Sequence, residues 1–426
     1  MTHAAALVQF LFNMTNMSRS TEGNGRPCRA GGAVLSSRAV SQYGRVALIH
    51  DYLNQYGGAE RVLEALHELF PDAPVYTSIY DPAAMPAHYR HWDIRPSWMQ
   101  RLPRWRKHFR KYFLFYPAAF ESFDLGAYDL VISSSSAYAK GVIPRPGATH
   151  ICYCHTPMRF GWRTGDYVER EAINGAFGTA LNLLLPLLRT WDVVSSQRVD
   201  RFIANSREVA GRIRRYYRRD ADIIPPPVDL APYEPRAPED FYLTGGRLVP
   251  YKRIDLVVEA FTRLKLPLVV FGSGRDRERL EALAGPNVRF VGRVSDAELQ
   301  DLYRRCCAYI TAGEEDAGIQ PVEAMAAGRP VIAYESGGVR ETVIEGLTGC
   351  FFAEQTAAAL AVAVARSRTI RWDAGAIRRH AEQFGRDRFK ERVLAVIEAQ
   401  LAARESSPAT AGQLVSRSAR EEIVRE

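Results

Sequence analysis

Residues 311–338 read TAGEEDAGIQPVEAMAAGRPVIAYESGG and decide the fold. A short apolar run that ends at Thr311 predicts a strand. The residues from about Gln320 onward predict a helix, with Pro321 in its first turn, where proline is tolerated. The apolar run 331–334 predicts the next strand. A strand, a helix and a strand in this order are typical of a βαβ unit around a parallel sheet.

The loop before this helix carries the first candidate site. The backbone N–H groups of Gly318, Ile319 and Gln320 are expected to point outward from the helix N-terminus, an arrangement that binds phosphate. Glu315 precedes the helix and Glu323 lies within it. Ionised carboxylates at such a place suit sugar hydroxyls, because each oxygen accepts a strong hydrogen bond. Each glutamate taken alone is more simply explained as an exposed, solvated residue.

A second candidate site follows the strand predicted over residues 241–244. Residues 245–252 read GGRLVPYK, in which Arg247 offers a bidentate fork for a diphosphate and Lys252 a compact point charge. Either residue alone could equally belong to a basic surface loop. Both follow the carboxyl end of a strand, where open α/β sheets bind their ligands, and this position favours the diphosphate site.

The same alternation of strands and helices fills most of the chain and indicates two doubly wound α/β units. Prolines at 225–227, 232, 235 and 238 disfavour helix and central strand and mark the boundary between the units. The sequence therefore predicts a disordered extension at 1–43, an N-terminal Rossmann-like acceptor domain at 44–235, a C-terminal Rossmann-like donor domain at 236–372, a helical segment at 373–404 that returns toward the first domain, and a flexible tail at 405–426.

Composition narrows the class of protein. The chain has 426 residues, of which 47% are apolar and 24% charged, as in soluble globular proteins. The formal net charge of +8 suits an anionic partner. The 6 cysteines have neither zinc-site nor disulfide-scaffold spacing, so we expect reduced, mostly buried thiols. No apolar run is long enough to cross a bilayer, and residues 4–12 make a poor secretory signal, so we expect a cytoplasmic protein.

Several stretches together resemble the retaining glycosyltransferases of family four, which have the GT-B fold. The C-terminal ones are GRLVPYK (246–252), FVGRVSDAEL (290–299) and the Glu-x7-Glu run from Glu315 to Glu323 that ends in EAMAAGRPVIA (323–333). The N-terminal ones are HDYLNQYGGAER (50–61), CYCHTPMRFGW (152–162) and FIANSREVAGRI (202–213). The chain looks most similar to the GDP-mannose-dependent mannosyltransferases that build bacterial polysaccharides, over about residues 45–401.

The resemblance implies roles for residues of the second half. Arg247 and Lys252 would hold the diphosphate of the donor, Glu323 its ribose hydroxyls, and Glu315 the hydroxyls of the transferred sugar. The backbone around two further residues would meet the base; these are Arg293 and Val294.

In the first half, the resemblance implies that His155 reaches the sugar. Gly57 and Gly58 would let the backbone approach the diphosphate closely. His155 also fits a core histidine that ends a strand, and the two glycines also fit a tight turn before a helix. The family usually has an aromatic residue where this chain has Ala317, which leaves the packing of the sugar loop open.

The predicted activity is transfer of a hexose, with mannose favoured, from a nucleoside-diphosphate sugar to a hydroxyl of a lipid-linked or oligosaccharide acceptor. The family implies retention at the anomeric carbon, with the departing phosphate taking the acceptor's proton. The cleft motifs contain no DxD pair, so we expect no metal and no other cofactor. The alternatives are a nucleotide-sugar epimerase of the same fold and a non-catalytic, membrane-docked partner of another transferase.

The segment from Arg101 to Phe120, RLPRWRKHFRKYFLFYPAAF, mixes basic and aromatic residues. Such a mixture docks on anionic membrane surfaces, where a lipid-linked acceptor would lie, so we expect a protein peripheral to the inner face of the plasma membrane. The composition also suits nucleic acid, although we expect no nucleic-acid partner. The plainest alternative is an amphipathic helix whose aromatic side chains pack inward.

Overall fold

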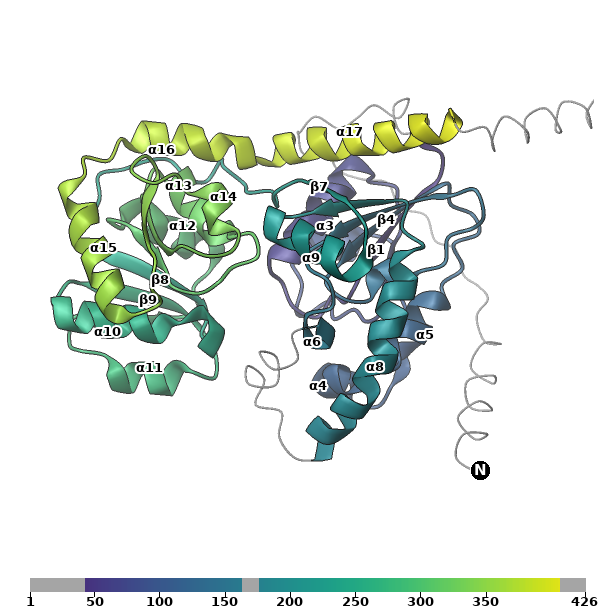
Figure 1. Ribbon diagram of the computed structural model, residues 1–426, viewed down its shortest axis with the longest axis horizontal. Coiled ribbons are helices and arrows are strands. Elements are labelled where there is room, and N and C mark those ends of the chain that lie inside the picture. The colour runs from purple at the N-terminus through teal and green to yellow at the C-terminus, as the bar shows by residue number, and fades with distance from the viewer. Residues whose placement is uncertain (1–42, 163–175, 407–426) are drawn as a thin grey trace, which may run out of the picture.

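The structure is a computed structural model and describes residues 43–162 and 176–406. Two parallel β-sheets, each flanked by helices, form two domains that lie next to each other (Figure 1). The first sheet has 7 strands in the order β3-β2-β1-β4-β5-β6-β7, and the second has 6 in the order β10-β9-β8-β11-β12-β13. The predicted class, α/β with two doubly wound domains, is confirmed.

The N-terminal domain is built on strands whose near-continuous apolar sequence suits a sheet covered on both faces. Every residue of the first strand is buried, for example. The strands are β1 (Val46–His50), β2 (Val75–Thr77), β3 (Ile94–Pro96), β4 (Leu130–Ser135), β5 (Thr149–Cys154), β6 (Arg201–Ala204) and β7 (Ala221–Ile223). The helices are α3 (Gly58–Leu69), α4 (Trp105–His108), α5 (Tyr116–Glu121), α6 (Arg159–Trp162), α8 (Ala176–Ser196) and α9 (Arg207–Tyr217), with 3-10 turns at Ala87–His91, Trp98–Arg101, Phe109–Tyr112 and Ala139–Gly141.

The C-terminal domain repeats the pattern. Its strands are β8 (Tyr242–Arg247), β9 (Leu268–Ser273), β10 (Val288–Gly292), β11 (Tyr309–Thr311), β12 (Val331–Tyr334) and β13 (Gly349–Phe352). Its helices are α10 (Ile254–Leu264), α11 (Arg277–Leu283), α12 (Asp296–Arg305), α13 (Ile319–Ala326), α14 (Val339–Thr342) and α15 (Ala357–Thr369), with a 3-10 turn at Pro250–Lys252.

The end of the chain joins the two domains. Helix α16 (Ala374–Ala381) packs on the second core, and a 3-10 turn at Glu382–Phe384 leads into α17 (Arg386–Glu405). Figure 1 shows α17 lying along the N-terminal domain, where Phe389, Val393 and Ile397 enter the first core. The linker, which runs from the N-terminal to the C-terminal domain, passes next to the turn before α17. There the Val228 amide donates to the Phe384 carbonyl at 2.9 Å. The chain therefore crosses between the domains twice at one place.

Several local predictions differ from the structure or fall outside it. The second core already includes Val228 and Tyr233, ahead of the predicted boundary at 235–236. The segment 101–120 forms short helices and turns rather than one helix, with Trp105 and Phe120 buried and its cations exposed. Residues 1–42 and 407–426 lie outside the described residues, so the extension, the tail and Cys28 are not assessed. In the part of the chain that the structure describes, no helix is long and apolar enough to span a membrane.

Candidate functional site

The carboxyl ends of the central strands of the second sheet gather most of the predicted donor-site residues. Arg247 ends β8 and is the register partner of Ser273, which ends β9. The guanidinium of Arg293, just after β10, donates to the Ser273 hydroxyl at 2.9 Å. Arg247 lies 3.4 Å from the Tyr251 hydroxyl. Both arginines are exposed and lie along one edge of the sheet. Val294 follows and packs partly against the second core.

Lys252 forms the centre of the site. Its Nζ lies 2.5 Å from Oε1 of Glu315 and 3.5 Å from Oε1 of Gln320. Burial would lower the pKa of Lys252, but the charges of Glu315 and Tyr251 outweigh it and raise that pKa above its ordinary value. Lys252 therefore stays a cation at neutral pH. The structure brings together the predicted phosphate ligand, the predicted sugar ligand and the first turn of α13.

Glycines make this close packing possible. A Cβ on Gly313 would lie 2.8 Å from the Lys252 Cα, and one on Gly246 would lie 3.1 Å from the Gln320 amide oxygen. Gly318 has φ 69 and precedes α13 with no side-chain cap hydrogen bond, so its left-handed backbone turns the loop into the helix. The helix begins at Ile319, slightly earlier than predicted.

Glu323 lies deeper in the same helix, at 2% exposure. Its carboxylate forms an ion pair with the guanidinium of Arg61 on α3, which belongs to the other domain. The pair borders a cavity of about 100 Å³ between the domains. The lining includes Tyr56, Arg61, Tyr233, Asp296, Glu323 and Arg386. Glu323 thus faces a hollow that both domains and the linker enclose.

The glycine pair of the first domain lies opposite the start of α13. Gly57 is the N-cap residue of α3, and Gly58 is its first residue. A Cβ on Gly58 would lie 2.6 Å from Cδ1 of Ile319, so the two residues are in close contact across the domains and a larger residue at 58 would make the end of that side chain shift. The predicted glycine turn therefore lies against the predicted phosphate-binding helix.

His155 follows β5 and belongs to a short chain of polar side chains. Its Nε2 lies 2.8 Å from the Ser134 hydroxyl, which in turn lies 3.1 Å from Nδ1 of His50. Burial, helped by the neighbouring His50, lowers the pKa of His155 to about 3, although the charge of Asp316 acts in the opposite direction. His155 is therefore neutral at physiological pH and serves as a hydrogen-bonding group rather than a cation.

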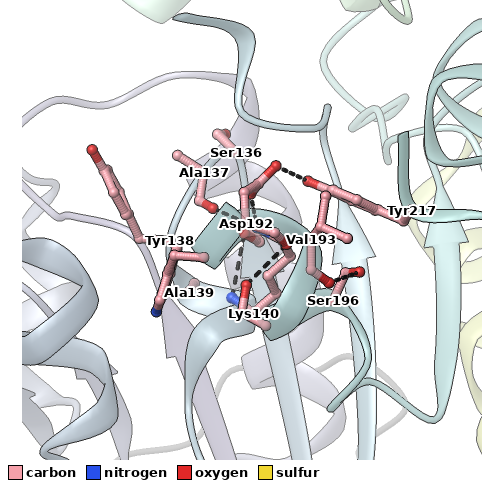
Figure 2. A network of polar contacts seen from close by, with 12 residues as sticks. Ser136, Ala137, Tyr138, Ala139, Lys140, Asp192, Val193, Ser196 and Tyr217 are labelled. Carbon is pink, nitrogen blue, oxygen red and sulfur yellow. Dashed lines mark hydrogen bonds and ion pairs between the residues drawn. The ribbon is translucent and has the colours of Figure 1, made fainter. Parts of the chain in front are cut away.

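A buried polar network supports the loop that follows β4, and Figure 2 shows its residues from Ser136 to Lys140. Both carboxylate oxygens of Asp51 accept hydrogen bonds from the backbone; the donors are the amides of Ser136, Ala137, Tyr138 and Ala139. Lys140, 1% exposed, forms an ion pair with Asp192 on α8. Asp192 also accepts from the Tyr217 hydroxyl at 2.9 Å and from the Trp162 indole at 2.6 Å. This network holds the loop to α8 and α9.

Sequence reasoning missed the residues that face the site from across the cleft. Arg61, Arg159 and Arg212 all bind carboxylates of the second domain. All three lie within the quoted stretches HDYLNQYGGAER, CYCHTPMRFGW and FIANSREVAGRI, so the motifs contained these residues but did not indicate which carboxylates they pair with. Among residues 43–162 and 176–406, no group of His, Cys, Asp and Glu side chains is arranged to hold a metal ion.

Comparisons with known proteins identify the family of both domains. Residues 56–232 match the Glycosyltransferase Family 4, and residues 230–375 match the Glycosyl transferases group 1. The chain is 33% identical over 172 residues to a GDP-mannose-dependent alpha-mannosyltransferase of Mycolicibacterium smegmatis, covering 37% of this chain and 46% of the relative. It is 32% identical over 243 residues to a D-inositol 3-phosphate glycosyltransferase of Thermomonospora curvata, covering 46% and 56%. The chain thus spans about half the length of these curated relatives.

Among solved structures, the chain is similar to the Anabaena protein HepE, which was solved in complex with UDP and glucose. The TM-score is 0.60 at 16% identity, and the match covers 83% of this chain and 99% of that one. At this identity the likeness speaks for the fold alone, and it confirms the predicted GT-B arrangement.

Proposed function

Because the chain belongs to glycosyltransferase family 4, we propose that it transfers a hexose from a nucleoside-diphosphate sugar to a hydroxyl of a lipid-linked or oligosaccharide acceptor. Mannose from GDP-mannose is the favoured donor, and synthesis of a cell-surface polysaccharide is the proposed setting. A relative named as a GDP-mannose-dependent alpha-mannosyltransferase supports the sugar. A second relative named as a D-inositol 3-phosphate glycosyltransferase shows that the similar chains differ in substrate.

The observation that carries the proposal is the contact of Lys252 with Glu315 and Gln320 at the start of α13. This contact brings together a cation that suits a diphosphate, Lys252, and a carboxylate that suits sugar hydroxyls, Glu315. Gln320 places both beside a helix N-terminus, which suits phosphate. Arg247 adds a second cation on the same edge, where its charge acts on Lys252. Such a set of groups suits a donor in which a sugar is joined directly to a diphosphate.

The same groups suit the chemistry of transfer. Breaking the bond between the anomeric carbon and the diphosphate leaves positive charge on the sugar and negative charge on the departing phosphate. Lys252, Arg247 and the amides of Gly318, Ile319 and Gln320 would stabilise that negative charge in a preorganised site. Glu315 would hold the sugar hydroxyls, and neutral His155 would reach the sugar from the other domain. The diphosphate itself would accept the proton of the acceptor hydroxyl, on the same face, so that the anomeric configuration is retained.

Glu323 would bind the ribose hydroxyls within the cavity between the domains. In the structure the carboxylate of Glu323 is paired with Arg61, so a bound ribose would have to share Glu323 with Arg61 or displace it.

We propose that Arg247 and Lys252 neutralise the leaving group without a divalent metal. Activity that is lost in a chelator and restored by a divalent cation would contradict this.

A transfer assay tests the function. We expect the purified protein to move mannose from GDP-mannose to a lipid-linked acceptor, and Lys252→Ala or Glu315→Ala to lower kcat by about 100- to 1,000-fold, the cost of removing one preorganised group at a developing charge. Arg263→Ala and Glu259→Ala are matched controls, because that ion pair lies on an exposed face of α10. Normal turnover in both site variants would show that the site is misassigned. Conversion of the nucleotide sugar without an acceptor would favour an epimerase.

A further inference from the structure

Two arginines of the N-terminal domain grip the loop that carries Glu315. Arg212 on α9 places Nη1 2.7 Å from Oδ1 of Asp316 and Nη2 3.4 Å from Oε1 of Glu314. Arg159 at the start of α6 forms an ion pair with the other carboxylate oxygen of Asp316. The side chains of Arg212 and Asp316 are 8% and 17% exposed, so solvent screens this contact only weakly.

Arg212 also connects this loop to the histidine of the first domain. Its Nη1 lies 3.3 Å from the hydroxyl of Thr156, the residue after His155. The carbonyl of His155 accepts a hydrogen bond from Asn205 at 2.9 Å, just ahead of the helix that carries Arg212. One guanidinium therefore touches both the segment that presents His155 and the loop that presents Glu315.

The loop needs such support for an electrostatic reason. Glu314, Glu315 and Asp316 are consecutive, and three neighbouring carboxylates repel one another. Lys252 compensates Glu315 from within the same domain. The compensating cations for Glu314 and Asp316 come from the other domain. The next residue, Ala317, is too small to anchor the loop by packing.

We propose that Arg212, assisted by Arg159, is a positioning residue: it clamps Asp316 and so holds Glu315 in place for the sugar only when the two domains are together. The proposal rests on the proposed function for the role of Glu315, while the clamp itself stands on the contacts above. The guanidinium groups of Arg212 and Arg159 already bind carboxylates. The two arginines therefore position the loop and do not contact the donor.

Kinetics and ligand binding test the role of the clamp. We expect Arg212→Ala and Asp316→Asn each to lower kcat by up to about 100-fold, the effect of misplacing a positioned group by about 1 Å. Binding of GDP alone should stay unchanged, because Arg247, Lys252 and Glu323 remain. The double variant should lose little more than the worse single variant, since the two residues form one contact. Arg214→Ala is the matched control, an exposed arginine of the same helix that pairs with Asp220.

Hydrogen–deuterium exchange gives a readout that does not depend on turnover. Amides of residues 313–319 should exchange faster in Arg212→Ala and Asp316→Asn than in the wild-type protein, and not in Arg214→Ala. If the wild-type protein transfers no sugar but this exchange pattern holds, the proposed function fails and the clamp stands. Unchanged exchange and kcat in both variants would overturn the clamp. Weaker GDP binding in Arg212→Ala but not in Asp316→Asn would show instead that the arginine is a phosphate ligand.

Discussion

Individual charged residues in this protein depend on their partners. The Lys252 side chain is 14% exposed and contacts the carboxylate of Glu315, and this contact raises the pKa of Lys252. A lysine that was buried without this carboxylate would lose its charge more easily. The ion pair at the proposed diphosphate site therefore also keeps the lysine charged.

His150 gives a prediction for the dependence of stability on pH. Burial lowers the pKa of His150 from 6.5 to about 4, and its Nε2 lies 2.9 Å from the Ser133 hydroxyl. The unfolded chain therefore binds a proton at a higher pH than the folded chain does. We expect the free energy of unfolding to fall by about 3 kcal/mol for this residue between pH 7 and pH 4.

Urea denaturation at the two pH values measures this effect. The His150→Gln variant should lose about 3 kcal/mol less than the wild-type protein over the same range, because glutamine has no proton to gain. His91→Gln, at an exposed position, is the control. Equal pH dependence in the wild-type protein and His150→Gln would contradict the prediction.

Among the secondary-structure elements, α8 depends on one buried ion pair. Lys140 lies in the 3-10 turn after β4, and Asp192 lies on α8 (Figure 2). We expect Lys140→Met to lower the free energy of unfolding by about 3–5 kcal/mol, because it leaves Asp192 buried without a cation. Chemical denaturation of this variant, of the exposed control Lys111→Met and of the double variant Lys140→Met/Asp192→Leu measures the effect. The double variant should recover part of the loss, and a Lys140→Met variant as stable as the wild-type protein would disprove the account.

The sequence predicted the long amphipathic elements better than the short ones. The helical period of residues 254–264 and 296–305 predicts helices that the structure has with those bounds, as α10 and α12, and a capping box at Ser295 marks the start of α12. No apolar run in the sequence predicts strands β3 and β7, since Ile94–Pro96 and Ala221–Ile223 are short edge strands with little apolar sequence. Strand β13 is mostly buried, but its four residues are too few for a period that would predict it.

The residues of the candidate site also divide into those that the sequence could place and those that it could not. Motif residues at strand ends, such as Arg247 and Lys252, could be placed because parallel strands bring their carboxyl ends to one edge. Arg61, Arg159 and Arg212 could not, because their contacts depend on how the two domains face each other. No local pattern in the sequence states that arrangement.

At the scale of the whole molecule, the basic segment 101–111 is the surface on which the expected membrane contact rests. The cations Arg101, Arg104, Arg106, Lys107, Arg110 and Lys111 are all exposed, and Leu114 beside them is 41% exposed. We expect the protein to co-sediment with phosphatidylglycerol vesicles at low salt and to be released at high salt. Arg104→Glu/Lys107→Glu/Lys111→Glu should weaken binding by about 100-fold or more, at about 1 kcal/mol for each cation.

The control for this surface has the same change in charge elsewhere, Arg214→Glu/Arg263→Glu/Arg388→Glu, at exposed positions outside the basic segment. Equal loss of vesicle binding in both triple variants would show that net charge, and not this surface, attracts the membrane. Binding that is insensitive to salt would exclude an electrostatic contact.

The two domains meet around the proposed donor site, and thermal unfolding with a panel of GDP-, UDP- and ADP-sugars tests that site without requiring an acceptor. At about 100 times its dissociation constant, the correct donor should stabilise the folded protein by about 2.7 kcal/mol. We expect GDP-mannose to raise the Tm of the wild-type protein and to leave that of Lys252→Ala nearly unchanged. No shift with any nucleotide sugar, or an equal shift in Lys252→Ala, would contradict the donor site described here.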